Sequence, residues 1–283
     1  MPDSKMNQVG QGQTILVTGA TGFLGRHICP ILIKKGFNLK IVCRGKVDLY
    51  DSLPNLKVIY TNDLFFESKD WWIKHLKGVD KILHLAWYVE HQKYWDSPNN
   101  ISCLEGSITL AKAALDIGIS HFVGVGTCAE YEDSPGIKGI NTALNPKSLY
   151  AATKSSTYFI LRSLFEGSKT SFTWCRLFYL WGEGEDSGRF VSKLHIALEN
   201  NKIFTIENGS LVRDYLHVTD AAENLVNTIV RGDSGPVNIC SGYGVSLSDL
   251  AMNIASKLGK SHLLYINLKE GDKPSSKSII GAP

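Results

Sequence analysis

Three features of this 283-residue chain have the residue types and spacing of a site that transfers a hydride and a proton. Tyr150 and Lys154 are a phenol and an ammonium four residues apart, so on a helix they share one face. About 125 residues upstream, glycines at 19, 22 and 25 follow an apolar run, and Thr127 lies between the two motifs. Each motif alone is weak, but their order and separation together predict a catalytic site that uses a dinucleotide.

The glycine motif links a strand expected at 15–17 to a helix expected at 23–35. Its spacing is GxxGxxG, which lets the backbone approach a pyrophosphate at the positive end of the helix. Asp63, after the third expected strand, could reach an adenine or could be an ordinary loop carboxylate. We assign cofactor binding to Gly19, Thr21, Gly22, Phe23, Leu24, Gly25, Arg44, Asp63, Leu64, Leu85, Ala86, Trp87, Tyr150 and Lys154.

The residue after the second expected strand bears on the choice of cofactor. A carboxylate at this place would hold the ribose 2′-hydroxyl of NAD, whereas a guanidinium suits the 2′-phosphate of NADP. Arg44 follows Cys43, and Asp48 lies four residues farther on. We therefore favour NADP(H) over NAD(H), with ribose binding by Asp48 as the alternative.

Short apolar runs alternate with helical periodicity through the first two thirds of the chain, which predicts a parallel sheet with helices on both faces. The expected fold is α/β, a Rossmann-type doubly wound parallel sheet with a smaller C-terminal α/β substrate lobe. We place the dinucleotide-binding domain at 1–172, with segments near 212–240 returning to it, and the substrate lobe mainly at 173–283. Expected strands are 15–17, 39–43, 57–60, 82–85, 122–125 and 172–175; expected helices are 23–35, 71–77, 98–115, 149–165, 190–200, 219–231 and 247–257.

Composition narrows the class of protein. With 43% hydrophobic and 20% charged residues, and no apolar run long enough for a membrane span, we expect a soluble protein. The net charge of +3 suits small anions, but no basic cluster indicates nucleic-acid binding. Six scattered cysteines without metal spacing indicate reduced thiols in the cytoplasm, and no metal. Residues 1–13 are polar and indicate a short loose leader.

These motifs resemble the extended short-chain dehydrogenase/reductase family, in particular its nucleotide-sugar epimerases, dehydratases and reductases. Residues 213–220 (RDYLHVTD) and 176–182 (RLFYLWG) resemble two further family segments, and the likeness spans about residues 13 to 280. The resemblance implies that Tyr150 exchanges a proton with the substrate while hydride passes between the nicotinamide and a sugar carbon. Lys154, helped by an oxidised nicotinamide, is expected to lower the pKa of Tyr150 and to hold the nicotinamide ribose, and Thr127 is expected to bind the reacting oxygen.

The two residues after Thr127 restrict the reaction. In the resembling 4,6-dehydratases they are an acid and a base, whereas here they are Cys128 and Ala129. A methyl group cannot carry a proton, so dehydration is disfavoured. Epimerisation at carbons 3 and 5 is also disfavoured, because the cysteine of fucose-synthase-type enzymes would stand at Ala129. We interpret Cys128 as a small buried thiol.

The substrate implied by the resemblance is a nucleoside-diphosphate sugar. Arg213 is the expected diphosphate partner, with a surface ion pair to Asp214 or Glu207 as the alternative. Tyr179 replaces the family's usual asparagine, and Trp87, Tyr88 and Trp181 are aromatic candidates for the sugar pocket. The expected substrate-binding residues are Trp87, Thr127, Cys128, Ala129, Tyr150, Tyr179, Arg189 and Arg213.

Reduction of a 4-keto-6-deoxy nucleotide sugar by NADPH, with Tyr150 as general acid, is the favoured function. An NAD-dependent 4-epimerase, a non-catalytic dinucleotide-binding regulatory protein and a reductase of a non-nucleotide ketone remain alternatives. Apolar stripes on helices 98–115 and 149–165 predict a homodimer through a four-helix bundle, by analogy with similar proteins. Residues 271–274 (GDKP) resemble the family's last segment, after which the family usually continues with a closing helix, so we expect either a short protein or a missing tail.

Overall fold

The computed structural model describes residues 9–45, 55–267 and 278–283. Asp48, residues 1–8 of the expected leader and residues 271–274 lie outside these ranges. Most of the described chain surrounds one seven-stranded sheet whose strands all pair in parallel. From edge to edge its strands are β12 (Gly235–Ile239), β7 (Ser171–Leu177), β5 (His121–Thr127), β4 (Lys81–His84), β1 (Thr14–Thr18), β2 (Asn38–Cys43) and β3 (Leu56–Tyr60).

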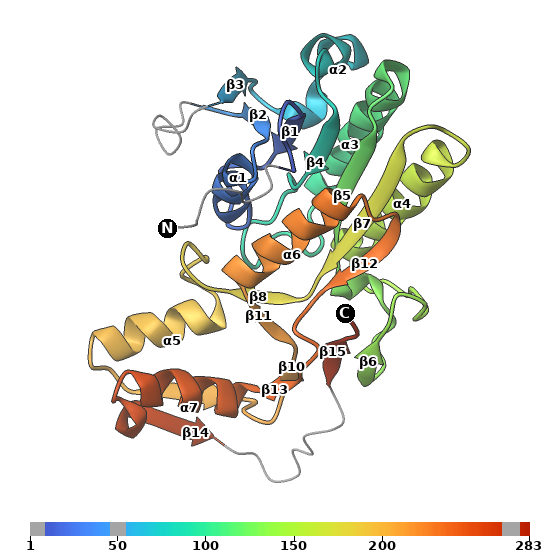
Figure 1. The fold of residues 1–283 in the computed structure, drawn as a ribbon. Helices are drawn as coiled ribbons and strands as arrows, with labels where there is room; N and C mark the ends of the chain where they lie inside the picture. The colour runs from blue at the N-terminus through green and yellow to red at the C-terminus, as the bar shows by residue number, and fades with distance from the viewer. Residues whose placement is uncertain (1–8, 46–54, 268–277) are drawn as a thin grey trace.

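Helices cover both faces of this sheet (Figure 1). One face carries α1 (Gly25–Lys34) and α6 (Val218–Arg231), and the other carries α2 (Lys69–Leu76), α3 (Asn99–Ile117) and α4 (Leu149–Phe165). Each face has its own apolar core, because strands buried on both sides present apolar side chains in both directions. The predicted doubly wound fold is confirmed.

The direction of strand succession reverses between β1 and β4. From β1 the chain continues to β2 and β3 on one side, and then crosses over to β4 on the other. In open parallel sheets, ligands bind at the carboxyl ends of the strands where the order reverses. This reversal places the turn after β1, the segment after β4 and the end of β5 along one edge of the sheet.

The expected helices form with small shifts at their ends. Helix α2 begins at Lys69, two residues before the expected start, because the Ser68 hydroxyl accepts a hydrogen bond from the Trp71 amide. Helix α3 runs two residues past the expected end, to Ile117, and stops at Gly118 in a left-handed conformation with φ +75°.

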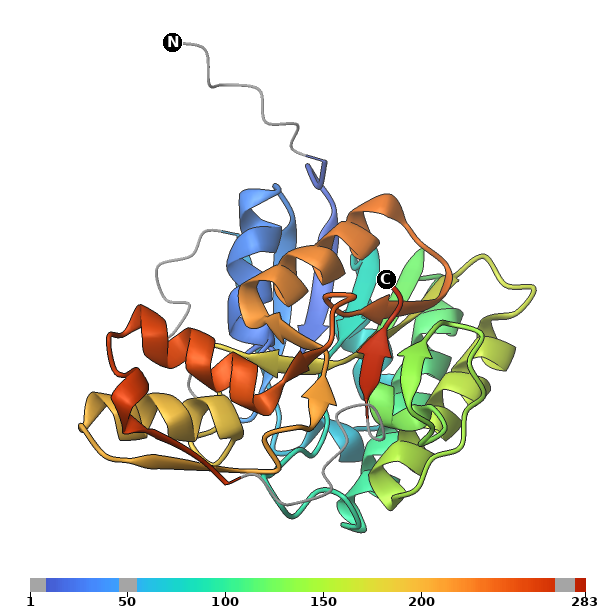
Figure 2. The same ribbon diagram turned by 90° about the horizontal axis from the view of Figure 1, so that it is seen from below.

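The C-terminal third builds smaller units beside the main sheet. Helices α5 (Phe190–Glu199) and α7 (Leu247–Lys257) pack on each other and on the parallel pair β9 (Phe204–Glu207) and β14 (Leu264–Asn267), around an apolar core of their own (Figure 2). A four-stranded sheet joins β13 (Val245–Ser246), β10 (Val212–Arg213), β15 (Ile279–Gly281) and β6 (Gly136–Lys138), and β8 (Tyr179–Trp181) pairs with β11 (Tyr215–His217).

Short 3-10 turns, and a C-terminal segment that rejoins the main sheet, are the remaining features of the described fold. Short 3-10 turns lie at η2 (Leu64–Phe66), η3 (Cys128–Glu130) and η4 (Ser261–Leu263). After the first part of the lobe the chain returns through α6, and β12 joins the edge of the main sheet beside β7. The expected boundary after residue 172 falls inside β7, so we propose a boundary after Leu177 instead.

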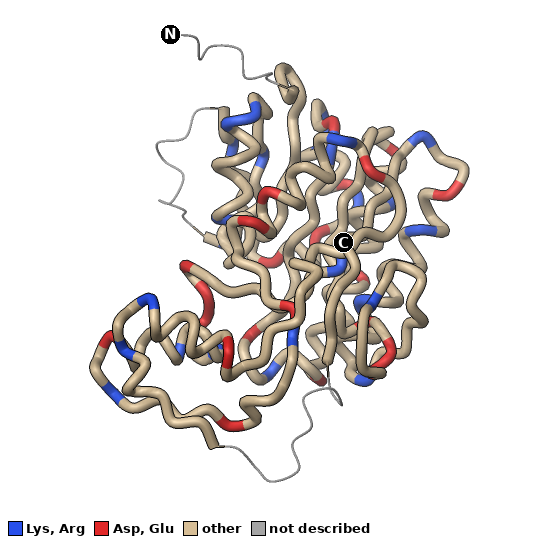
Figure 3. Tube along the Cα trace, turned by 60° about the horizontal axis from the view of Figure 1, so that its bottom comes forward, with Lys and Arg blue, Asp and Glu red and all other residues tan. Residues whose placement is uncertain are grey.

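Basic and acidic residues are interspersed along both the sheet domain and the smaller lobe (Figure 3). Within the described residues, no helix combines the length and the apolar character needed to cross a lipid bilayer. In the same ranges, no group of three or more His, Cys, Asp or Glu side chains is arranged to hold a metal ion. All six cysteines lie in the described part of the chain, are buried, and form no disulfide bond there.

Candidate functional site

The glycine turn after β1 lies against the segment that follows β4. Gly19 has φ +72°, a conformation that favours glycine, and its carbonyl accepts a hydrogen bond from the Gly22 amide at 3.1 Å. A Cβ atom at Gly19 would come within 2.8 Å of the Ala86 amide nitrogen. The turn therefore depends on glycine to bring the ends of β1 and β4 together.

The first turn of α1 has the features of an anion-binding site. Leu24 at the N-cap makes no side-chain capping bond, and the turn contains no acidic residue. A Cβ atom at Gly25 would collide with the backbone of Gly19 and Ala20, so this cradle is closed to larger residues. An uncapped helix N-terminus beside a glycine turn fits the pyrophosphate of a dinucleotide. The residues present therefore fit the cofactor that the sequence predicts.

The other predicted cofactor residues occupy the expected strand ends. Arg44 is exposed directly after β2. The Asp63 carboxylate accepts a hydrogen bond from the Phe65 amide and caps η2, so it has a structural role at the buried Leu64. Leu85 and Ala86 donate their amides to Thr18 at 3.2 Å each. These contacts place the cofactor candidates along one edge, and their contact with a cofactor stays a prediction.

Thr127 ends β5 and also caps the short turn η3. Its hydroxyl accepts from the Ala129 amide at 3.2 Å, and its own amide donates to the Glu130 carboxylate at 2.8 Å. This reciprocal arrangement is a capping box, which satisfies two amides that the turn would otherwise leave unpaired. The box fixes the position of the Thr127 side chain.

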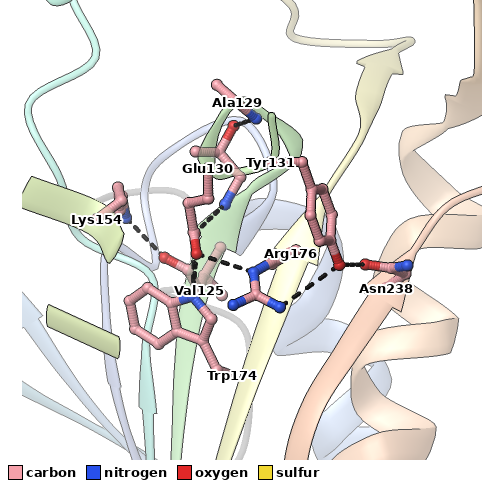
Figure 4. A network of polar contacts seen from close by, with 9 residues as sticks. Val125, Ala129, Glu130, Tyr131, Lys154, Trp174, Arg176 and Asn238 are labelled. Carbon is pink, nitrogen blue, oxygen red and sulfur yellow. Dashed lines mark hydrogen bonds and ion pairs between the residues drawn. The ribbon is translucent and has the colours of Figure 1, made fainter. Parts of the chain in front are cut away.

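The Glu130 side chain belongs to a buried network beneath Thr127 (Figure 4). It accepts from Arg176 Nε at 2.8 Å and from the Trp174 indole at 3.0 and 3.1 Å. Arg176 also donates to the Tyr131 hydroxyl at 3.4 Å, and that hydroxyl donates to Asn238 at 2.7 Å. The network ties the ends of β5, β7 and β12 together under the site.

Tyr150 lies in the first turn of α4 and packs under two aromatic rings. Ser148 caps the helix by accepting from the Ala151 amide, and the Tyr150 amide donates to the Trp95 carbonyl at 2.8 Å. The Tyr150 ring lies 4.8 Å from the Tyr94 ring and 5.7 Å from the Trp95 ring, edge to face. The Thr127 hydroxyl lies close enough to the Tyr150 phenol to lower its pKa in part. The structure thus brings together two of the three predicted catalytic residues.

The pKa of Tyr150 in this structure is set mainly by burial. Burial raises the pKa of Tyr150 well above its usual value, Tyr94 raises it further, and the neighbouring Thr127 hydroxyl lowers it in part. Burial therefore outweighs any lowering by Lys154 here, and the effect expected of Lys154 together with an oxidised nicotinamide stays a prediction. Removing a phenol from water disfavours its anion, and this effect dominates here. Tyr150 is a protonated phenol at neutral pH.

Lys154 is buried and bound to other groups on the same side of α4. Its ammonium donates to the Val125 carbonyl at 2.6 Å and lies 3.8 Å from the centre of the Trp87 ring. Burial lowers the pKa of Lys154 to about 7, while Cys103 and Glu130 oppose the shift. The lysine therefore changes its charge near neutral pH.

A cavity of ≈ 240 Å³ opens between the sheet domain and the smaller lobe. Tyr94 forms part of its wall, so the cavity adjoins the ring that covers Tyr150. Its lining includes Tyr179 and Arg189, both predicted to bind substrate, and adds His91, Glu185 and Tyr215. Burial raises the pKa of Glu185 to about 7, and Arg189 lowers it in part. A larger cavity of ≈ 580 Å³ lies near Arg162 and Gly235, at the opposite edge of the sheet, and contains none of the predicted site residues.

Arg213 contacts Tyr179 rather than the carboxylates considered as alternatives. Its Nε donates to the Tyr179 hydroxyl at 3.0 Å. Asp214 is fully buried and accepts from Ser241, Gly242 and Gly281, which ties the ends of β12 and β15 to β10. The Glu207 carboxylate accepts from Asn267. Arg213 therefore contacts a residue that lines the cavity, but Arg213 itself is not part of the lining.

The residues after Thr127 have the expected character. Cys128 is 9% exposed, and burial raises its pKa to about 12, so it is an inert thiol at neutral pH. Ala129 contributes its amide to the capping box. Trp181 packs edge-on against His217, in the core of the smaller lobe, and is not among the residues that line the cavity.

Several residues of the site were not predicted from the sequence. Tyr94 and Trp95 cover Tyr150, Glu185 and Tyr215 line the cavity, and Glu130 anchors Thr127. The density of aromatic residues in the segment 87–95 is the one sequence signal that points to a covering loop. The buried pair of Glu130 and Arg176 has no local signal, because its members lie on different strands.

Comparison with known proteins shows what this chain is similar to. A family model described as the NAD dependent epimerase/dehydratase family matches residues 15–240. A dTDP-6-deoxy-L-talose 4-dehydrogenase (NAD(+)) from Aggregatibacter actinomycetemcomitans is 23% identical over 238 residues, covering 82% of this chain and 86% of the relative. A UDP-glucose 4-epimerase from Rhizobium meliloti (strain 1021) is 27% identical, covering 93% of this chain and 87% of the relative.

Solved structures show the same fold. The UDP-N-acetylglucosamine 4-epimerase from Methanobrevibacter ruminantium M1, in complex with UDP-N-acetylmuramic acid, superposes with a TM-score of 0.84 at 24% identity. The match covers 96% of this chain and 90% of that structure.

Proposed function

The chain belongs to the NAD-dependent epimerase/dehydratase family, and we propose that it reduces the 4-keto group of a nucleotide sugar. The neighbouring hydroxyls of Thr127 and Tyr150 carry this proposal, because the first can donate a hydrogen bond to the reacting carbonyl oxygen and the second can protonate it. The relative that acts as a 4-dehydrogenase supports chemistry at carbon 4. The protein is an enzyme of nucleotide-sugar metabolism in this proposal.

Each side chain has one role in the reduction. When bound, a nicotinamide dinucleotide supplies the hydride. Tyr150 donates its proton to the carbonyl oxygen as that oxygen gains negative charge, and Thr127 donates a hydrogen bond to the same oxygen. A raised pKa keeps Tyr150 protonated, which suits an acid in the direction of reduction. Ala129 offers no group for the elimination of water, so the reaction ends with the alcohol.

The substrate enters the cavity beside Tyr150 in this proposal. Arg189 in the cavity lining supplies positive charge, and Arg213 lies behind Tyr179, so both guanidinium groups suit a diphosphate bound on this side. The aromatic rings of Tyr94, Trp95 and Tyr179 suit the apolar faces of a sugar.

We propose NADP(H) as the preferred cofactor because Arg44 stands exposed after β2. A guanidinium can make two charge-assisted hydrogen bonds to a 2′-phosphate. We expect Arg44→Ser to weaken binding of NADPH by about 10- to 100-fold and to change binding of NADH little. Titration of both cofactors into the wild type and the variant tests this; equal losses for the two would contradict it.

An NAD-dependent 4-epimerase is the second candidate, and the match to a UDP-glucose 4-epimerase favours it. The same pair, Thr127 and Tyr150, could serve oxidation and return of the hydride on opposite faces. The purified protein separates the two functions. A reductase needs added NADPH and consumes one per turnover, whereas an epimerase carries retained NAD and interconverts its sugars without added cofactor.

Substrate identity can be approached through stability. A ligand that binds only the folded state raises the unfolding temperature. We would compare dTDP, UDP, GDP and CDP, each with NADP⁺ or NAD⁺, in a thermal-shift panel. A shift with one nucleoside diphosphate and one dinucleotide supports the proposed function, and no shift with any combination contradicts it.

We also propose that α3 and α4 form the dimer interface. Ile101 on α3 and Phe159 and Ile160 on α4 are 41%, 44% and 39% exposed. Large apolar residues exposed along paired helices are typical of an interaction surface. Light scattering on the wild type and on Phe159→Glu tests this, with a dimer expected for the first and a monomer for the second.

A further inference from the structure

The indole of Trp87 covers the ammonium of Lys154 inside the protein. The Nζ atom lies 3.8 Å from the centre of the Trp87 ring, and Lys154 is 3% exposed. The Trp174 ring lies 5.9 Å away, and the Val125 carbonyl accepts from the ammonium at 2.6 Å. A cation in such a dry place is attracted to the negative face of an aromatic ring. Trp87 and the Val125 carbonyl therefore hold this ammonium in one position.

Trp87 is itself held by a buried amide at the start of α3. Its indole N–H donates to the Asn100 side-chain oxygen at 2.8 Å, and Asn100 is fully buried. The Asn100 amide group donates to the backbone carbonyls of Tyr94 and Ser97, at 2.6 and 2.9 Å. One side chain thus fixes both ends of the segment 87–97.

The same segment covers Tyr150. The rings of Tyr94 and Trp95 pack on the Tyr150 ring, and the Trp95 carbonyl accepts from the Tyr150 amide at 2.8 Å. The segment 87–97 therefore contacts the phenol at one end and the ammonium at the other.

We propose that Trp87 is a positioning residue that holds the Lys154 ammonium in place, and that Asn100 holds Trp87 there. This inference rests on the proposed function for its effect on turnover, but its geometric part is independent of any substrate. Trp87 is not among the residues that line the ≈ 240 Å³ cavity, so its role differs from that of a sugar-stacking ring.

The charged and titratable groups that face Lys154 come from three elements. Glu130 follows β5, His84 ends β4 and Cys103 lies on α3. Burial lowers the pKa of His84 to about 3, with Lys154 adding to the shift, so His84 is neutral at physiological pH. A substitution of Trp87 removes none of these three groups. A resulting change in the position of the Lys154 ammonium can therefore be attributed to the loss of the indole.

Nuclear magnetic resonance of the full chain with ¹³Cε-labelled lysine tests the position directly. Protons near the face of an indole are shifted upfield, so the Lys154 signal should lie upfield of the other lysine signals. It is assigned by its loss in Lys154→Met. In Trp87→Leu the signal should move to the ordinary lysine region, in Trp87→Phe it should keep part of the shift, and in Asn100→Ala it should broaden or move. Trp71→Leu removes an indole that packs on Trp72 and His75 and should leave the signal unchanged.

Turnover gives the functional readout. In Trp87→Leu we expect kcat to fall about tenfold while KM for the nucleotide sugar changes little, since a cation–π contact of this kind is worth up to about one factor of ten in rate. Trp87→Phe, which keeps an aromatic face, should recover most of the activity. The pH profile of kcat should show an apparent pKa that belongs to Lys154. This apparent pKa should shift in Trp87→Leu and stay unchanged in Trp71→Leu.

The outcomes separate this inference from the proposed function. If the wild type turns over no nucleotide sugar, the proposed function fails, and the lysine signal still decides whether Trp87 holds Lys154. An unchanged lysine signal in both Trp87→Leu and Trp87→Phe overturns the inference. A moved signal with wild-type kcat in Trp87→Leu overturns the claim that the position matters for the reaction.

Discussion

Tyr150 and Lys154 share one face of α4, yet the Lys154 ammonium lies against Val125 and Trp87, and burial and Tyr94 set the pKa of Tyr150. Burial therefore keeps the Tyr150 phenol protonated, and it lowers the pKa of Lys154 to about 7, so that the ammonium can lose its proton near neutral pH. The neighbouring Thr127 hydroxyl opposes this rise in the pKa of Tyr150 in part. The unliganded arrangement therefore favours proton donation by Tyr150.

The buried lysine should cost stability. Its folded-state pKa of about 7 lies below the value of 10.5 for an exposed lysine, so the unfolded chain binds this proton more tightly. We expect Lys154→Met to unfold at a higher temperature than the wild type at pH 6, with the difference shrinking as pH rises through the window from 7 to 10.5. Thermal unfolding across this range measures it. Lys112→Met, an exposed change on α3, is the control, and a constant difference at all pH values would contradict the account.

The pair of Glu130 and Arg176 should behave as a buried ion pair. Their side chains are 0% and 1% exposed, so removing one partner leaves a charge in the interior. We expect Glu130→Gln or Arg176→Met to lower the free energy of unfolding by about 3–5 kcal/mol. The double variant should recover part of this loss because neither charge remains. Denaturant unfolding of the three variants measures the coupling; losses that simply add would contradict a direct pair.

Glu185 should make stability depend on pH near neutrality. Its folded-state pKa of about 7 is above the ordinary 4.5. The contribution of the protonated Glu185 to stability is therefore fully present below about pH 4.5 and is lost as the pH rises to 7. The free energy of unfolding of Glu185→Gln should not fall over this range. Relative to the wild type, this variant should therefore become more stable as the pH rises from 5 to 8. Glu183→Gln, an exposed neighbour, provides the comparison. The proposal is wrong if the two glutamine variants follow the same curve.

Gly25→Ala should disturb the dinucleotide site. The added Cβ would meet the backbone of Gly19 and Ala20, which must shift to admit it. We expect binding of both NADPH and NADH to weaken by about tenfold or more, since the turn loses its fit to the pyrophosphate. Gly45→Ala is the matched change, because a Cβ there meets no atom within 4 Å. Cofactor fluorescence titration distinguishes the two, and equal affinities in both would count against this site.

Local patterns were sufficient for the parts of the site that depend on neighbours in the chain. The glycine turn after β1 and the start of α4 at Leu149 were predicted because strand, turn and helix signals are contiguous. The parallel sheet followed from the alternation of strands and helices, except for its edge strand β12, which was not among the expected strands. Cys128 was correctly read as a buried thiol.

The remaining features depend on contacts between distant segments. Spacing on α4 placed Tyr150 and Lys154 on one face, but it could not show that Trp87 lies over the ammonium. Asn100 fixes Trp87 and the backbone at Tyr94, and no sequence pattern marks an asparagine for that role. Side-chain direction within a face is decided by packing, and no local pattern shows it.

The most direct test of the central claim is single-turnover hydride transfer in Tyr150→Phe, with Tyr158→Phe on the same helix as the control. NADPH carrying deuterium at the transferred position should label carbon 4 of a 4-keto nucleotide sugar with the wild type and with Tyr158→Phe. Loss of the proton donor in Tyr150→Phe should slow this transfer by about 10²- to 10⁴-fold, while binding of the nucleotide sugar is retained. Transfer at the wild-type rate in Tyr150→Phe, or no label at carbon 4 with the wild type, would contradict the account.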